Sequence, residues 1–100
     1  MRRTVVRYKT RPEAADENAR LVAAVYAALT EADPGDFRYV TYRLADGVTF
    51  VHVAHQDGET NPLAAIPEFA EFQRDLAARC VEQPDPAAAT VVGSYGWEKS

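Results

Sequence analysis

Residues 37–44 and 48–55 form two runs that alternate as β-strands do, yet in each run both alternating sets of side chains are largely apolar. Between the runs, Ala45-Asp46-Gly47 predicts a hairpin turn, because glycine accepts the positive φ angles that tight turns require. An antiparallel sheet with one solvated face alternates between apolar and polar positions. These two strands are therefore expected to be covered on both faces.

The segments before the hairpin predict a strand and then a long helix. Residues 4–9 contain valines and a tyrosine that favour a strand, and Pro12 fits the first turn of a helix. Residues 13–32 carry a stripe at helical spacing that ends before Asp33-Pro34-Gly35-Asp36. The stripe consists of Asn18, Leu21, Val22, Val25, Leu29 and Ala32.

The segments after the hairpin predict a second helix and a last strand. The helix is expected to begin near Leu63 or Pro67 and to run to about Val81. Its buried stripe comprises Ile66, Phe69, Phe72 or Gln73, Leu76 and Cys80. The proline-rich residues 84–86 predict a loop, because proline cannot continue a helix. Residues 88–97 are then expected to form the last strand.

The order β-α-β-β-α-β predicts one ferredoxin-like α+β domain over residues 1–100, with a four-stranded antiparallel sheet and both helices on one side. Two helices can cover only one face of such a sheet. Large apolar patches left on the other face usually mark an interface. A homodimer that packs sheet face against sheet face is therefore expected, with two-fold symmetry. The alternative is a monomer in which long side chains and loops shield this face.

Charge and composition narrow the kinds of partner. The net charge of -4 argues against a nucleic-acid partner, because phosphate binding relies on clustered Lys and Arg. Cys80 is the single cysteine, so an internal disulfide is excluded and a reducing, cytoplasmic location is expected. No apolar run approaches the ~20 residues that a membrane-spanning helix needs, so no membrane span is expected.

His52 is the first candidate for chemistry. It interrupts an otherwise apolar strand face, and imidazole titrates near neutral pH, so His52 is either a hydrogen-bonded core histidine or a catalytic proton carrier that lines a cavity. His55 stands three residues further along the same strand, and side chains at that spacing point to opposite faces. The two histidines therefore cannot share one ion, and no metal site is expected.

The companions of His52 depend on the register of the hairpin. If Asp46-Gly47 is a two-residue loop, the face of His52 also carries Tyr39, Thr41, Arg43 and Phe50. That polar and aromatic cluster suits a small anionic or aromatic ligand. If the loop has three residues, Val40 and Tyr42 share that face instead, and the core is nearly dry. The sequence leaves both registers open.

Trp97 and Tyr95 are in phase on the expected last strand. Aromatic side chains near a dimer seam usually act as packing anchors, because they bury a large area. The alternative for Trp97 is stacking on an aromatic substrate, which makes it a candidate for substrate binding.

The element order and three segments resemble a known group of proteins. Residues 44–53 (LADGVTFVHV), 61–63 (NPL) and 66–69 (IPEF) look like those of the dimeric α/β barrels, which include the antibiotic-biosynthesis-monooxygenase-like proteins. The resemblance implies that the sheets of two subunits close into a barrel and that residues 91–97 reach toward the partner. It also implies a small-molecule cavity between the sheet and the helices of each subunit.

The same resemblance implies an activity. Cofactor-free monooxygenases of this group act on electron-rich aromatic molecules that react with oxygen themselves, so no cofactor is expected. In that case His52, with Tyr39, Arg43 or Tyr42, would orient or deprotonate an aromatic or quinone-like ligand. Haem-degrading members have an Asn on the first strand and a Trp and a His on the second helix, which residues 4–9 and 63–81 lack. The alternative function is a non-catalytic dimeric scaffold or accessory protein.

Overall fold

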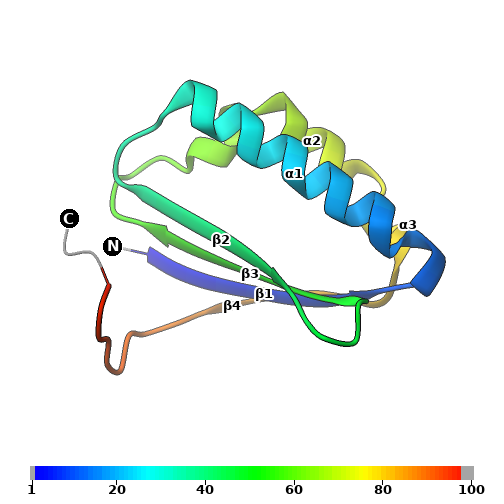
Figure 1. The fold of residues 1–100 in the computed structure, drawn as a ribbon. Coiled ribbons are helices and arrows are strands. Elements are labelled where there is room, and N and C mark those ends of the chain that lie inside the picture. Colours follow the sequence, from blue (N-terminus) through cyan, green and yellow to red (C-terminus); the bar gives the residue numbers. More distant parts are fainter. Residues whose placement is uncertain (1, 98–100) are drawn as a thin grey trace.

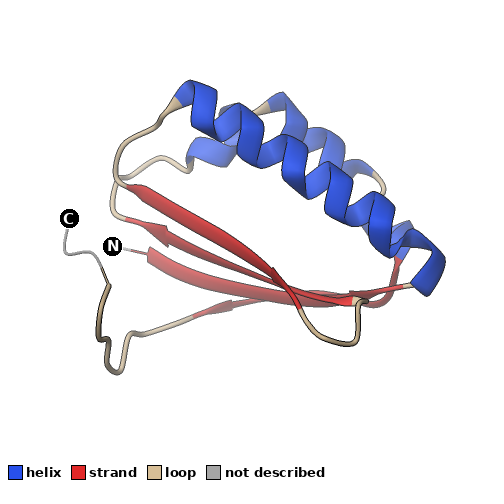
Figure 2. Ribbon diagram, in the orientation of Figure 1, coloured by secondary structure: helices blue, strands red, loops and turns tan. Residues whose placement is uncertain are grey.

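The computed structural model describes residues 2–97 and shows a four-stranded antiparallel sheet with the helices packed on one side (Figures 1 and 2). The ferredoxin-like α+β fold expected from the sequence is confirmed. The strands are β1 (Arg2–Thr10), β2 (Phe37–Arg43), β3 (Thr49–Gln56) and β4 (Cys80–Ala88), in the sheet order β2-β3-β1-β4. The helices are α1 (Ala15–Ala32), α2 (Pro67–Arg74) and the short α3 (Leu76–Arg79), and the 3-10 turns are η1 (Pro12–Ala14) and η2 (Pro62–Ala65).

The hairpin has the first of the two registers left open by the sequence. Thr41 lies opposite His52 and Arg43 lies opposite Phe50. The side chains of Tyr39, Thr41 and Arg43 therefore share the helix-facing side of the sheet with His52. The register that would have placed Val40 and Tyr42 there is wrong.

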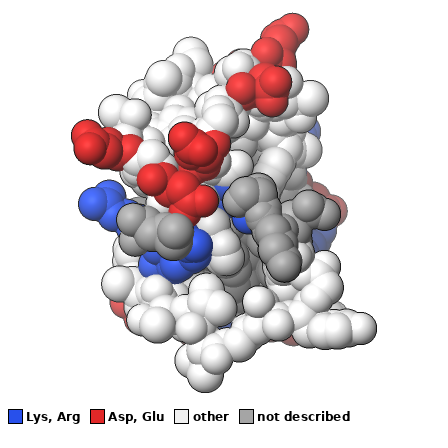
Figure 3. Space-filling view, turned by 90° about the vertical axis from the view of Figure 1, so that its left-hand side faces the viewer, with Lys and Arg blue, Asp and Glu red and all other residues white. Residues whose placement is uncertain are grey.

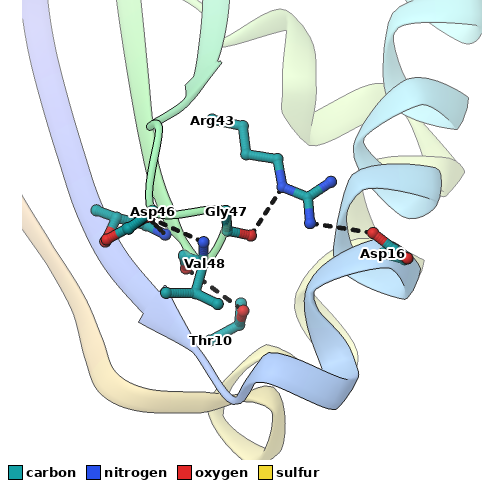
Figure 4. A network of polar contacts seen from close by, with 7 residues as sticks. Thr10, Asp16, Arg43, Asp46, Gly47 and Val48 are labelled. Atoms are coloured by element: carbon teal, nitrogen blue, oxygen red, sulfur yellow. Dashed lines mark hydrogen bonds and ion pairs between the residues drawn. The ribbon is translucent and has the colours of Figure 1, made fainter.

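Asp46 organises the turn that sets this register. Its carboxylate accepts hydrogen bonds from the backbone N–H groups of Val48 and Thr49, each at 2.9 Å, and from the Thr49 hydroxyl at 2.6 Å (Figure 4). These bonds, that of the hydroxyl first, lower the pKa of Asp46 to about 2. Gly47 has a φ of 80°, which an L side chain rarely adopts, so the glycine is needed here.

The second helix is interrupted and shorter than expected. Asp75, with φ −117° and ψ 21°, separates α2 from α3, and the helical segment ends at Arg79 instead of Val81. Cys80 is already extended and begins β4. The predicted stripe is buried at Ile66, Phe72 and Leu76, so the choice between Phe72 and Gln73 falls to Phe72.

The last strand is not where the sequence placed it. We expected a loop at residues 84–86 and a strand over 88–97, but β4 spans Cys80–Ala88 and residues 89–97 form no strand. Pro86 pairs with Val6 in the ladder between β1 and β4. Proline is tolerated there because β4 is an edge strand, whose outer N–H groups have no partner to lose. Register shifts between Arg7 and Thr10 accommodate the irregular strand.

The core lies between the inner face of the sheet and one face of the helices. Its buried members are Tyr8, Ala15, Val22, Val25, Phe50, Leu63, Phe72 and Leu76. Tyr8 and Phe50 stack across the β1–β3 pair with their ring centroids 5.5 Å apart. The predicted stripe of α1 is buried at Asn18, Val22 and Val25, whereas Ala32 at its end is exposed. Asn18 is thus a polar group within the apolar layer.

We expect Phe50→Ala to lower the free energy of unfolding by about 3–5 kcal/mol, because it leaves a cavity beside Tyr8. The Phe50 side chain is 2% exposed. Val92, at 98% exposure, offers a matched truncation, and Val92→Ala should change the free energy of unfolding by less than about 0.5 kcal/mol. Urea unfolding followed by circular dichroism measures both. Equal losses for the two variants would contradict this description of the core.

Candidate functional site

An open cavity of about 270 Å³ lies between the inner face of the sheet and α2. Its apolar and aromatic wall includes Val6, Phe37, Ala54, Leu63, Phe69, Phe72, Leu76 and the prolines Pro84 and Pro86. Its polar members are Arg2, Thr4, Tyr8, Tyr39, His52, Gln56, Asn61 and Gln73. Arg2, Asn61 and Gln73 are exposed, so the cavity is accessible from solvent. Figure 3 looks onto the end of the molecule where β1 begins, where acidic side chains gather beside basic ones.

His52 forms the polar centre of the cavity wall, and both of its ring nitrogens have partners. Nε2 lies 2.8 Å from the Tyr8 hydroxyl. Nδ1 lies 2.6 Å from the Tyr39 hydroxyl and 3.2 Å from the Thr41 hydroxyl. The imidazole is 5% exposed and is held between aromatic side chains of the sheet and the Phe72 ring of α2. Its neighbours therefore determine its orientation.

This group of hydrogen bonds continues in both directions away from His52. Asn18 of α1 donates to the Tyr8 hydroxyl at 2.8 Å, and Arg79 of α3 donates from Nε to the Asn18 amide oxygen at 3.0 Å. On the other side, the hydroxyls of Thr41 and Tyr26 lie 2.8 Å apart. The buried polar chain thus links α3, α1, β1, β3 and β2.

Burial keeps the histidine and the tyrosines of this chain uncharged at neutral pH. Removal from water lowers the pKa of His52 to about 4, so the imidazole is neutral. The same effect raises the pKa values of Tyr8 and Tyr39, which both remain phenols. The polar groups around His52 are therefore neutral, and the exposed Arg2 is the charged residue among the described lining residues, which include no carboxylate or thiolate.

Of the residues that the sequence suggested for a site, the structure brings His52, Tyr39 and Thr41 together. His52 and Tyr39 line the cavity, and Thr41 stands behind them, bonded to His52. Phe50 is on the same face but lies in the core, outside the cavity lining. Arg43 is at the far end of the hairpin, where it donates to the Gly47 carbonyl and to Asp16 of α1 (Figure 4).

Trp97 lies on the opposite side of the sheet. Its ring stacks on that of His55 with the centroids 6.5 Å apart, and it lines a groove formed by the outer sheet face and residues 89–94. It does not line the cavity that contains His52. Among residues 2–97, no group of three or more potential metal ligands is found. None of the helices in this range is long and apolar enough to cross a bilayer.

Sequence reasoning missed Tyr8, Asn18 and Arg79 as parts of the site. Asn18 had a signal, because it is the one amide in the apolar stripe of the first helix. Arg79 follows Phe72 and Leu76 at helical spacing, so its position on the buried face was also readable. Tyr8 is in phase with Val6 on β1, but the pairing of β1 with β3 that brings it to His52 was not available from the sequence.

No protein-family model and no curated protein matches this chain. Solved structures do match its fold. One is described as an antibiotic biosynthesis monooxygenase and is 14% identical, with a TM-score of 0.70 over 93% of this chain and 100% of the other.

Two further similar structures are described by their activity. One is SnoaB, a cofactor-independent oxygenase of Streptomyces nogalater, in a mutant form; it is 19% identical with a TM-score of 0.69 over 96% of this chain and 97% of the other. The other is the monooxygenase ActVA-Orf6 of Streptomyces coelicolor in complex with nanaomycin D, also 19% identical, with a TM-score of 0.64 over 97% and 92% of the two chains. At these identities the likeness shows the fold, which confirms the resemblance noted from the sequence at that level.

The burial of neutral His52 predicts a dependence of stability on pH. The unfolded chain binds a proton at this histidine near pH 6.5, whereas the folded protein binds it only near pH 4. The free energy of unfolding should therefore fall as the pH decreases through this window, by about 3 kcal/mol at most from this group. Urea unfolding of the wild type and of His52→Gln isolates the effect, because the difference between them should shrink toward pH 4.

His55→Gln is the matched control for this measurement, since His55 is less buried than His52 and lies on the opposite face of the sheet, so the variant should keep most of the wild-type pH dependence. A difference between the wild type and His52→Gln that is constant from pH 7 to pH 4 would contradict the assignment of a neutral buried His52.

Proposed function

We propose that this protein binds a small, flat aromatic molecule with a phenol or quinone oxygen in the cavity at His52, and that it oxidises this molecule with O₂ and no cofactor. The observation that carries the proposal is an accessible, aromatic-walled cavity in which the Tyr39 hydroxyl is held against a neutral imidazole. The solved structures of the same fold that are described as oxygenases support it by analogy.

The cavity lining suits such a ligand. Phe37, Phe69 and Phe72 offer ring faces and edges for stacking, and the volume of about 270 Å³, just below the usual range for drug-sized ligands, limits the site to a small molecule. Ligand sites combine predominantly apolar walls with a few polar groups that fix orientation. Here Tyr39, backed by His52, is the polar group that would contact a ring oxygen. Arg43, Phe50 and Trp97 are left out of this ligand set because they lie outside the cavity.

The proposed reaction replaces the two hydrogens of an activated ring CH₂ group, as in an anthrone, with one oxygen atom of O₂. The second oxygen atom leaves with those hydrogens as water, so that substrate and O₂ supply all atoms and electrons. The protein contributes a dry site that fixes the ring and a hydroxyl that stabilises charge developing on the ring oxygen. His52 holds that hydroxyl in place.

A specific observation also favours a second function, that of a non-catalytic scaffold. A scaffold predicts a histidine whose hydrogen bonds are met by its own neighbours, and both nitrogens of His52 are in that position. The cavity that is open beside His52 is not explained by that function, because a scaffold predicts a filled interior. We therefore place the scaffold second.

We further propose that two copies of the chain pack through the outer face of the sheet. Val5, Val40, Val51 and Val53 lie on this face, and Tyr42 beside them is 48% exposed. Within residues 2–97 the helices lie on the other side (Figure 2), and the outer face is covered only by the segment 89–97, whose Val92 and Tyr95 are themselves almost fully exposed. A second copy packed here would bury the outer sheet face and the segment 89–97.

The single cysteine, Cys80, is consistent with the reducing compartment that we propose for the protein.

Filling the cavity should abolish oxidation without unfolding the protein. Ala54 lines the cavity, and Ala54→Leu adds three carbon atoms where the ring would lie. Ala27→Leu adds the same atoms on the exposed side of α1 and serves as the control. With anthrone as substrate, oxygen uptake should fall at least about tenfold for Ala54→Leu and stay at the wild-type rate for Ala27→Leu. No oxygen uptake by the wild type above the uncatalysed rate would remove the oxygenase function.

The dimer is tested by sedimentation at micromolar concentration. The wild type should sediment with twice the mass of one 11.0 kDa chain. Val53→Asp places a charge at the centre of the outer sheet face and should yield monomers, whereas Ala27→Asp on the exposed helical side should remain dimeric. A monomeric wild type would reject the proposed interface.

A further inference from the structure

Arg79 is a buried cation whose side-chain partners in the described part of the chain are neutral. Its side chain reaches the Asn18 amide oxygen, the Phe72 carbonyl at 2.8 Å and the Phe72 ring, whose centroid lies 5.5 Å from the guanidinium carbon. Arg79 itself is 5% exposed. Burying a charge is costly even when its hydrogen bonds are met. An arginine in this position therefore calls for a role that an apolar residue could not fill.

The first consequence of Arg79 is a fixed orientation of the Asn18 amide. A guanidinium can only donate hydrogen bonds, so the atom of Asn18 that faces it must be the oxygen. The amide nitrogen of Asn18 then faces the Tyr8 hydroxyl and donates to its oxygen. The reverse orientation would place two donors against each other at Arg79.

The second consequence concerns the proton on His52. Because the Tyr8 oxygen accepts from Asn18, its own hydrogen needs an acceptor within this buried site, and His52 Nε2 at 2.8 Å is the partner in reach. Nε2 must then carry the lone pair, and the imidazole proton is on Nδ1. The tautomer of His52 is thus determined by Arg79, which is three hydrogen bonds away along this chain.

The third consequence appears at the cavity. Nδ1–H donates to the Tyr39 oxygen at 2.6 Å, with the Thr41 hydroxyl at 3.2 Å as the more distant acceptor. Tyr39 accepts this bond and keeps its own hydrogen for an acceptor in the cavity that it lines. The lone pair of His52 faces Tyr8, so the imidazole is not placed to take a proton from a ligand.

We propose that Arg79, acting through Asn18 and Tyr8, holds His52 in its Nδ1–H tautomer, so that Tyr39 donates a hydrogen bond to a carbonyl-type oxygen of the ligand. The identity of the ligand in this inference rests on the proposed function, whereas the tautomer of His52 rests on the hydrogen bonds alone. Arg79, Asn18, Tyr8 and His52 are positioning residues in this arrangement. Tyr39 is the residue that contacts the ligand, and the arrangement selects quinone-like acceptors over groups that only donate.

The tautomer is measured directly by long-range proton–nitrogen correlation spectra of ¹⁵N-labelled, ligand-free protein at pH 7, with His55→Gln to assign the signals of His52. The expected result is a protonated Nδ1 and an unprotonated Nε2. A protonated Nε2 in the wild type overturns the proposal, whatever the protein binds.

Asn18→Asp tests the direction of the chain. The new carboxylate accepts from both Arg79 and Tyr8, which turns the Tyr8 hydrogen away from His52 and forces the proton onto Nε2. Arg20→Gln on the exposed side of α1 changes the net charge by the same amount and should leave the tautomer unchanged. If Asn18→Asp does not fold, Tyr8→Phe replaces it and should yield a mixture of tautomers. An unchanged Nδ1–H tautomer in the folded variant overturns the proposal.

Binding of 1,4-naphthoquinone, which only accepts hydrogen bonds, tests the role of Tyr39. In Asn18→Asp the unprotonated Nδ1 takes the Tyr39 hydrogen, so the affinity should fall about tenfold, as it should in Tyr39→Phe. A reversed tautomer with unchanged affinity overturns the role of Tyr39. A wild type that does not bind naphthoquinone counts against the proposed function. The spectra of His52 still decide whether Nδ1 or Nε2 carries the proton.

Discussion

The structure depends on one constraint: the polar side chains buried between the sheet and the helices must all find hydrogen-bond partners. Thr10, Asn18, Thr49, His52, Gln56 and Arg79 are all buried. Each unpaired donor or acceptor in such a layer would cost about 1–3 kcal/mol. The chain of side-chain hydrogen bonds from Arg79 to Thr41 connects five structural elements. It therefore couples the positions of α1 and α3 to the register of the sheet. A shift of one residue in any of these strands would break it.

The same chain determines what the cavity can recognise. An apolar wall would hold any ring of suitable size, and orientation comes from the polar groups alone. Because the burial of His52 disfavours its charged form, the polar groups around His52 carry no charge at neutral pH, and the exposed Arg2 is the charged residue of the lining. Ligand recognition at His52 therefore depends on which atoms of His52 and Tyr39 carry the hydrogens. In our proposal Arg79, which lies outside the cavity lining, controls these positions.

Much of this was readable from the sequence, and the failures have physical causes. The element order, the stripe of α1 and the hairpin followed from periodicity and from Gly47, and the polar face of His52 with Tyr39 and Thr41 was one of two open registers. The choice between registers depended on three hydrogen bonds to Asp46, which no periodicity reports. The last strand was misplaced because proline reads as a strand breaker unless the edge position of β4 is known. Tyr8 and Arg79 meet the site only through pairings between segments far apart in the chain.

The prolines of β4 have a consequence for assembly beyond their effect on one ladder. β4 and β2 are the free borders of the sheet, and Pro84 and Pro86 deprive the β4 border of two hydrogen-bond donors. A strand of another molecule that pairs with β4 would lack hydrogen-bond partners at these positions, which disfavours growth of the sheet into fibres through this border. The segment that the sequence predicted as a loop thus protects the β4 border from pairing with another strand, while the outer face of the sheet remains the surface through which we propose that two copies meet.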